Sequence, residues 1–216
     1  MPYNTVLFDL DGTLTDPFEG ITRSIQHALE KMGSEVPDAN ALRWCIGPPL
    51  WESFAVLLGT EERSELDRAV AFYRERYTVT GLFENTLISG IDTLLEGLAA
   101  DGRQLFVATS KPHAYAGKIV DHFGLGGYFK KVYGSELDGT RSAKAELIAY
   151  LMREEGIGAE TCAMIGDRKH DLIGARANRV DSVGVLWGYG SREELEGEGP
   201  VAIVADAPEL GRVLGV

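Results

Sequence analysis

Short runs of apolar residues recur along the chain, and each ends at a glycine or a polar residue. The first run, Thr5–Asp9 (TVLFD), lies near the N-terminus and is closed by an Asp-Gly turn two residues later. Runs of this length bounded by turn residues predict buried β-strands. The later runs, which predict four further strands and a short sixth, are Gln104–Thr109, Lys131–Gly134, Cys162–Gly166, Ser182–Trp187 and Val201–Val204.

Segments with apolar residues at helical spacing separate these runs. They are Ile91–Ala100, Ala114–Phe123, Ser142–Glu155 and Asp171–Asn178. Strands that alternate with helices of this length predict βαβ units and a parallel sheet. The pattern therefore indicates the α/β class, with a Rossmann-like, mostly parallel sheet at its core.

A long stretch after the first strand breaks this alternation. It contains helical segments, among them Gly20–Lys31 and Glu61–Tyr77, and no convincing strand. We expect residues 17–80 to form a small all-α domain, inserted into a core made of residues 1–16 and 81–216. Ligands of open α/β sheets bind at the carboxyl ends of the strands. An insert that leaves from that edge is expected to cover the site as a cap.

Polar residues gather where the predicted strands end. Because parallel strands bring such positions to one edge of the sheet, these side chains are expected to form a single site. The set combines several carboxylates, hydroxyls and lysines, and consists of Asp9, Asp11, Gly12, Thr13, Thr109, Ser110, Lys111, Lys144, Asp167 and Asp171.

This set of groups is typical of phosphoryl transfer through a covalent aspartyl phosphate. Carboxylates and backbone carbonyls are the hard oxygen ligands that Mg²⁺ prefers, and a carboxylate can also be the nucleophile. A hydroxyl and an ammonium group can hold the phosphoryl oxygens. Residues two apart in a strand lie on one face, so Asp9 and Asp11 can act together. Gly12 lets the backbone turn sharply after them.

Charge and composition restrict the partners. The formal net charge of −12 disfavours nucleic acids and anionic membrane surfaces as partners, since both repel an acidic chain. The two cysteines, Cys45 and Cys162, lack metal-binding spacing and predict reduced thiols. No stretch approaches the roughly 18 apolar residues of a membrane-spanning helix. We expect a cytoplasmic protein, a monomer or homodimer, that acts on a small phosphorylated metabolite.

Together, the stretches DLDGTLTD and GDRKHD, the hydroxyl of Thr109 and the amine of Lys144 resemble the haloacid dehalogenase (HAD) superfamily. The helical insert directly after the first motif is similar to the helical-cap subgroup, subfamily IA. Within it, the chain is most similar to phosphoglycolate phosphatase-like and 5′-nucleotidase-like hydrolases. The resemblance implies a Mg²⁺-dependent phosphatase, with phosphoglycolate as the leading substrate and a nucleoside monophosphate as the second.

The resemblance also implies a role for each aspartate. Asp9 is expected to be the nucleophile that becomes phosphorylated. Asp11 is expected to protonate the leaving oxygen and then to deprotonate the attacking water. Mg²⁺ would be held by Asp9, the backbone carbonyl of Asp11 and Asp167, with Asp171 binding directly or through water. Dehalogenases of the superfamily lack a carboxylate at position 11, so its presence favours phosphate esters as substrates.

The remaining groups are assigned to the phosphoryl group and the substrate. Thr109 is expected to hydrogen-bond the phosphoryl group, and Lys144 to offset its charge and that of Asp9. Arg141, Lys130 and Lys131 compete with Lys144 for that role, since alanine follows Lys144 where the family often has proline. The residues expected to line the substrate site are Gly12, Thr13, Ser110 and Lys111.

Three further residues lie beside these motifs. Arg168 and Lys169 either offset the aspartate charges or contact phosphate. Asp16 is expected to cap the first helix of the insert, since aspartate is favoured at that position and Pro17 suits the first turn.

Other protein classes use similar residues. A phospho-accepting receiver domain also combines aspartates, a hydroxyl, a lysine and Mg²⁺ on a parallel sheet, but it is shorter and places the acceptor on a middle strand. A phosphomutase and a haloacid hydrolase of the same superfamily are further alternatives. A calcium-binding loop starting at Asp9 is excluded, because Leu14 and Gly20 fall where glycine and glutamate are required.

Overall fold

The computed structural model describes residues 3–216. The chain forms two compact units, which are considered separately below. Unit 1 comprises the chain up to Asp16 together with Leu87–Val216, and unit 2 comprises Pro17–Thr86. The sequence places the end of the insert at residue 80, six residues before the end of unit 2. Helical structure continues without a break through the π-helix Tyr77–Gly81, and Glu84 beyond it binds Arg23 and Arg76 of the same unit.

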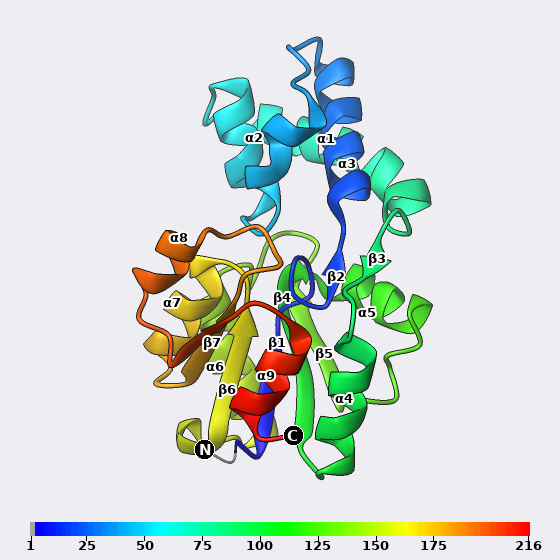
Figure 1. Cartoon of the computed structure of the whole chain (residues 1–216). Coiled ribbons are helices and arrows are strands. Elements are labelled where there is room, and N and C mark those ends of the chain that lie inside the picture. The colour runs from blue at the N-terminus through cyan, green and yellow to red at the C-terminus, as the bar shows by residue number, and fades with distance from the viewer. Residues whose placement is uncertain (1–2) are drawn as a thin grey trace. The chain divides into compact units, whose positions relative to one another are not determined.

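Unit 1 is built on a six-stranded sheet with the strand order β5-β4-β1-β6-β7-β8 (Figure 1). All five neighbouring pairs are parallel, which confirms the predicted α/β class with a mostly parallel sheet. The strands are β1 (Thr5–Phe8), β4 (Gln104–Pro112), β5 (Lys131–Ser135), β6 (Cys162–Gly166), β7 (Asp181–Val185) and β8 (Ala202–Val204).

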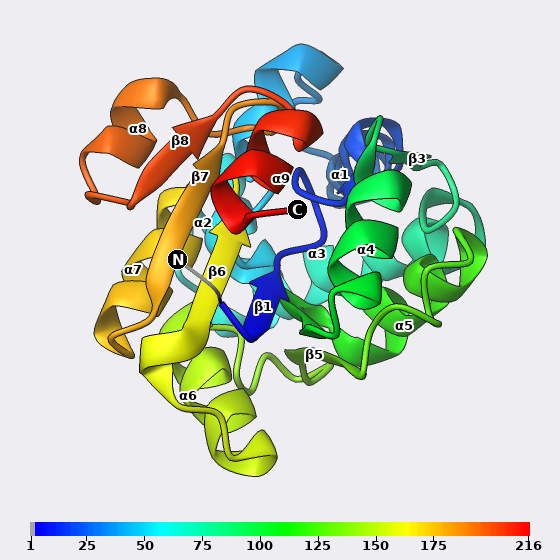
Figure 2. The ribbon, with the colours of Figure 1, turned by 60° about the horizontal axis from the view of Figure 1, so that its bottom comes forward.

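Helices cover both faces of this sheet (Figure 2). Helices α6 and α7 pack together on one face, whereas α4, α5 and α9 lie on the other. Their bounds are α4 (Ile91–Ala100), α5 (His113–His122), α6 (Lys144–Glu155), α7 (Lys169–Ala177), α8 (Arg192–Glu196) and α9 (Ala207–Leu214). The short helices α8 and α9 are absent from the sequence prediction.

Strand β1 lies in the middle of the sheet, between β4 and β6. Its four residues are all buried, as expected for a parallel strand that is covered on both faces. Leu7 packs with Phe106 of β4, Met164 of β6 and Leu147 of α6 in the core beneath one helical layer. This packing fixes the end of β1, from which the first aspartates emerge.

Strand β4 runs further than predicted. The sequence ends it at Thr109, whereas the strand continues to Pro112, with irregular pairing to β5 between Thr109 and Pro112. The hydroxyl of Ser135 donates a hydrogen bond to the Ser110 carbonyl at 2.8 Å across this irregularity. The extension holds Thr109, Ser110 and Lys111 in a rigid element rather than in a loop.

Unit 2 consists of helices joined by loops, with Thr86 at its end in the short strand β3. Phe54 and Tyr73 are buried and meet edge to face in its core, with ring centroids 6.4 Å apart. Two short strands, β2 (Thr15–Asp16) and β3 (Thr86–Leu87), pair where the chain passes between the units. The helices of unit 2 are α1 (Phe18–Met32), η1 (Ala39–Cys45), α2 (Leu50–Leu58), α3 (Arg63–Arg76) and η2 (Tyr77–Gly81).

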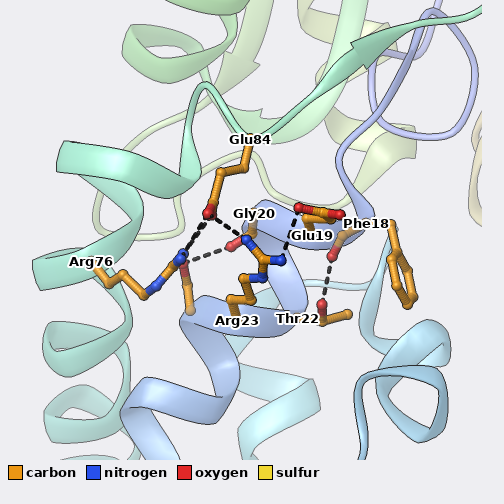
Figure 3. Close-up of polar contacts among 8 residues, drawn as sticks. Phe18, Glu19, Gly20, Thr22, Arg23, Arg76 and Glu84 are labelled. Atoms are coloured by element: carbon orange, nitrogen blue, oxygen red, sulfur yellow. Dashed lines mark hydrogen bonds and ion pairs between the residues drawn. The ribbon is translucent and has the colours of Figure 1, made fainter.

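A polar network ties the beginning of unit 2 to its end (Figure 3). The Glu84 carboxylate accepts hydrogen bonds from Arg76 at 2.7 and 2.9 Å and from Arg23 at 2.9 Å. Arg23 also pairs with Glu19 at 3.1 Å. The backbones of α1 and η2 lie in close contact beside this network. A Cβ on Gly20 would lie only 2.0 Å from the Gly81 carbonyl. Thus α1 and the segment after η2 are fixed to each other.

Among residues 3–216, no helix is long and apolar enough to cross a membrane.

Candidate active site

Asp9 and Asp11 lie in a tight loop that follows β1. The Asp9 amide still belongs to the sheet, since it donates to the Ile165 carbonyl at 2.9 Å. Gly12 has a φ of +83°, a left-handed conformation that suits glycine, and its amide donates to the Thr15 carbonyl at 2.7 Å. The loop therefore holds both aspartates, which are 5% and 8% exposed, at the carboxyl edge of the sheet.

Three buried carboxylates converge at this edge. Oxygen atoms of Asp9, Asp167 and Asp171 all lie within 4.8 Å of one another. Asp167 directly follows β6, and Asp171 lies in the first turn of α7, where its Oδ2 accepts from the Arg168 amide at 3.2 Å. Two sequence motifs about 160 residues apart thus meet in one acidic cluster, as expected from the parallel sheet.

Lys144 lies within this cluster. Its Nζ is 2.8 Å from Asp9 Oδ1, 2.7 Å from Asp171 Oδ1 and 2.8 Å from the Ala108 carbonyl. Burial alone would lower the pKa of the Lys144 ammonium, but the charges of Asp171 and Asp9 outweigh it and raise that pKa above its ordinary value. Lys144 is therefore a fixed positive charge against Asp9. Arg141 instead pairs with Glu136, and Lys130 with Glu155.

Asp11 forms a separate ion pair. Lys111 Nζ lies 2.7 Å from Asp11 Oδ2, and both side chains are almost fully buried. Among the described residues, no group hydrogen-bonds the buried second oxygen, Asp11 Oδ1. Burial raises the pKa of Asp11 and the Lys111 charge opposes that rise. The carboxyl group thus has one oxygen held by Lys111 and one oxygen without such a partner among the described residues.

The charges of the cluster fit a divalent cation. When Asp9, Asp167 and Asp171 are all ionised, they carry three negative charges against the one positive charge of Lys144, which leaves two negative charges for a cation to balance. Burial, followed by the charges of Asp171 and Asp9, raises the pKa of Asp167 well above its ordinary value. Burial also raises the pKa of Asp171 to about 6, against the opposing effect of Lys144. Hard carboxylate oxygens at this spacing are suitable ligands for Mg²⁺.

The two threonines that the sequence assigned to the site have different hydrogen-bond partners. Thr109 is 2% exposed at the carboxyl edge of β4, where its Oγ1 accepts from the Lys111 amide at 3.3 Å. The fully buried Thr13 hydroxyl donates to Asp167 Oδ1 at 3.4 Å. The Thr13 side chain is thus directed to a carboxylate of the cluster, whereas the sequence assigned it to the substrate.

One prediction is wrong. Asp16 does not cap the first helix of unit 2, because the N-cap of α1 is Pro17 and no side chain caps it. Asp16 instead accepts a hydrogen bond from the Tyr189 hydroxyl. The motif favoured a cap because aspartate before proline is a strong local signal, but a contact between positions 173 residues apart overrides it.

Sequence reasoning also missed the segment that follows β7. Its residues reach both aspartate loops: Trp187 Nε1 donates to the Thr13 carbonyl at 3.0 Å, and the Tyr189 amide donates to Asp167 Oδ2 at 2.8 Å. The only sequence signal is the pair of closely spaced glycines, Gly188 and Gly190, after a strand, which is typical of a close backbone approach. Arg168 Nε pairs with Glu194 at 2.9 Å, and the Arg168 charge also acts on the nearby Asp167, where it opposes the rise in pKa.

A mostly parallel α/β sheet whose central strand ends in two aspartates, opposite a buried lysine and two further aspartates, defines a class of phosphoryl-transfer enzyme. The chain belongs to the haloacid dehalogenase-like hydrolase family, whose model matches residues 6–185. This result confirms the resemblance found in the sequence motifs.

Known proteins resemble the chain over nearly its whole length. It is 51% identical to a 5′-nucleotidase of Pseudomonas aeruginosa, over 98% of this chain and 96% of that protein. It is 38% identical to the tyrosine-protein kinase PtkA of Mycobacterium tuberculosis, over 98% of this chain and 72% of that protein. The crystal structure of a predicted phosphatase from Clostridium acetobutylicum superposes with a TM-score of 0.96 at 42% identity, covering both chains completely. The chain is a phosphatase, that is, a phosphoric monoester hydrolase.

Proposed function

We propose that this phosphatase hydrolyses nucleoside 5′-monophosphates through an aspartyl phosphate on Asp9, with Mg²⁺ as its cofactor. The observation that carries the chemistry is the buried cluster of three carboxylates and one ammonium group. The Lys144 ammonium places a positive charge 2.8 Å from the carboxylate that would act as the nucleophile. The two remaining negative charges support a divalent cation at the same place.

In the first step, an oxygen of Asp9 attacks the phosphorus atom of the substrate, and the bond from phosphorus to the ester oxygen breaks. Lys144 binds Asp9 Oδ1, which leaves Oδ2 as the attacking atom. The protonated Asp11 gives its proton to the leaving oxygen. The raised pKa of Asp11 supports this role, since a general acid must hold its proton near the working pH.

In the second step, water attacks the phosphorus atom of the aspartyl phosphate, and the bond from phosphorus to the Asp9 oxygen breaks. Asp11, now ionised, takes the proton from that water, and inorganic phosphate leaves. Thr109 and Lys144 would hold the phosphoryl oxygens, with Ser110, Lys111 and the Gly12 backbone beside them. Mg²⁺, held by Asp9, Asp167, Asp171 and the Asp11 carbonyl, would neutralise charge that develops on the phosphoryl group.

The identity of 51% with a 5′-nucleotidase over almost both full lengths supports a nucleotide as substrate. This reverses the order drawn from the motifs, in which phosphoglycolate came first. Unit 2 begins at Pro17, directly after the aspartate loop and β2, and we propose that it acts as the cap that selects the substrate. A mononucleotide brings two negative charges, which the lysines of the site would attract into an otherwise acidic protein.

The test is a comparison of kcat/KM for nucleoside 5′-monophosphates and phosphoglycolate with Mg²⁺, scored by released phosphate. The proposal expects at least one 5′-monophosphate to exceed phosphoglycolate by tenfold or more. A preference for phosphoglycolate would contradict the substrate assignment but not the chemistry. Transfer of phosphate from ATP to protein tyrosine, without phosphate release, would instead favour the activity for which PtkA is named.

A further inference from the structure

The chain segment after β7 forms what we call the strap, residues 187–194. It runs from Trp187 across the carboxyl edge of the sheet into α8. None of its residues belongs to a motif that the sequence assigns to catalysis. Nevertheless, its backbone and side chains contact both aspartate loops of the site.

The strap holds Asp167 by two backbone hydrogen bonds. The Tyr189 amide donates to the carboxylate at Oδ2 over 2.8 Å, and the Gly190 amide donates to the main-chain carbonyl over 3.1 Å. The Thr13 hydroxyl reaches the other carboxylate oxygen, Oδ1, at 3.4 Å. Both oxygens of a fully buried carboxylate are therefore directed by fixed donors, which sets the orientation in which Asp167 can meet a cation.

Glycines allow the strap to come this close. A Cβ on Gly188 would lie 2.3 Å from Asp167 Cβ, 2.4 Å from Asp167 Oδ2 and 2.5 Å from the Gly12 carbonyl. A Cβ on Gly190 would lie 2.1 Å from the Asp167 carbonyl. Since real Cβ contacts are longer, any side chain at either position would push the strap away from Asp167.

The strap is also anchored at both of its ends. At the first end, Trp187 Nε1 donates to the Thr13 carbonyl, and the Tyr189 hydroxyl donates to Asp16 in β2. At the other end, Glu194 Oε1 accepts from Arg168 Nε at 2.9 Å and from the Lys169 amide at 2.8 Å. The two aspartate loops are thus fastened to each other through the strap.

We propose that the strap is a positioning element that pre-orients Asp167 for the cation, with Tyr189 as its central residue. This inference rests on the metal site of the proposed function. Groups that orient a metal ligand typically contribute a factor of about 10 to 100 in metal affinity. Without the strap, the Asp167 carboxylate would have to be ordered by the cation itself, and the free energy of that ordering would be lost from binding.

The test compares Gly188→Ala and Tyr189→Phe with Gly127→Ala, a matched control in unit 1 where a Cβ meets no atom within 4 Å. The dissociation constant for Mg²⁺ is measured by titration calorimetry on substrate-free protein. Gly188→Ala is expected to bind Mg²⁺ about tenfold or more weakly. Tyr189→Phe, which keeps the amide and loses only the bond to Asp16, is expected to bind about threefold more weakly. Gly127→Ala is expected to match the wild type.

Turnover provides a second measurement. If the strap acts through the cation, raising Mg²⁺ restores kcat in both variants, and the KM for substrate at saturating Mg²⁺ is unchanged. If Tyr189→Phe and folded Gly188→Ala both bind Mg²⁺ within twofold of the wild-type affinity, the proposed role of the strap is overturned and the proposed metal site is not. If Gly188→Ala does not fold, Tyr189→Phe decides by itself. A wild-type protein that binds no Mg²⁺ would overturn the proposed metal site together with the strap.

Discussion

At the scale of single residues, the site is a balance of buried charges. The sequence identified the aspartates because they lie at or shortly after the ends of apolar runs, and Lys144 because it lies just before the helix that follows the run Lys131–Gly134. The structure brings Asp9, Lys144, Asp167 and Asp171 together. The sequence did not reveal that Asp16 accepts a hydrogen bond from the Tyr189 hydroxyl, because local capping preferences carry no information about a partner 173 positions away.

These buried carboxylates predict how metal binding depends on pH. Burial raises the pKa of Asp171 to about 6 and that of Asp167 well above its ordinary value. Protons therefore compete with Mg²⁺ as the pH falls through about 6. We expect the rise in Tm produced by saturating Mg²⁺ to be much larger at pH 7.5 than at pH 5.5.

Without metal, the dependence of folding stability on pH is expected to have the opposite sign. A carboxyl group whose pKa is raised by folding stabilises the folded state below its unfolded pKa and loses that contribution as the pH rises through its folded pKa. In EDTA, Asp167 and Asp171 should thus make the protein less stable at pH 7.5 than at pH 5.5. A Mg²⁺-induced shift in Tm that is equal at both pH values would contradict a cation among these carboxylates.

At the scale of elements, the apolar pattern predicted all six strands of the main sheet, most of them with small differences at their ends. The bounds of β6 and of the helix Ile91–Ala100 were predicted to the residue. Buried strands in a parallel sheet are near-continuous apolar runs and are therefore easy to detect. The short helix α8 and the strap were missed, since their charged residues are typical of a solvated loop. Glu194 is instead bound to Arg168, a pairing that only the tertiary structure creates.

The network around Glu84 in unit 2 gives a prediction at this scale. Glu84 binds Arg76 through two hydrogen bonds, and both side chains are only about a fifth exposed. Glu84→Gln is expected to lower the free energy of unfolding by about 1–2 kcal/mol, because charge-assisted bonds in a partly buried pair are lost. Urea unfolding measures this difference.

Glu19→Gln is the matched control, because it breaks a surface pair with Arg23 in which both side chains are more than half exposed. Surface pairs of this kind contribute about 0–1 kcal/mol. Equal effects of Glu84→Gln and Glu19→Gln would show that Glu84 does not fasten α1 to the segment after η2.

At the scale of the whole molecule, the fold, the site and the similarity to known proteins define the family. They do not define the substrate, which we propose to be a nucleoside 5′-monophosphate. The motifs at the strand ends determine the phosphoryl chemistry and leave the ester group undefined. Residues in unit 2 follow no such motif, because helix packing constrains their apolar faces and leaves their polar faces free to vary. For this reason the motifs alone placed phosphoglycolate first and a nucleotide second, with no residue that decides between the two substrates.

We propose that Asp9 carries the phosphoryl group during turnover. The most direct measurement uses Asp11→Asn with p-nitrophenyl phosphate and Mg²⁺, because this leaving group departs without a general acid, whereas hydrolysis of the aspartyl phosphate still needs a base. We predict a burst of one nitrophenol per active site and, after acid quenching, a mass increase of one phosphoryl group on the peptide containing Asp9. A burst with the phosphoryl group on another residue, or undiminished turnover by Asp9→Asn, would show that Asp9 is not the nucleophile.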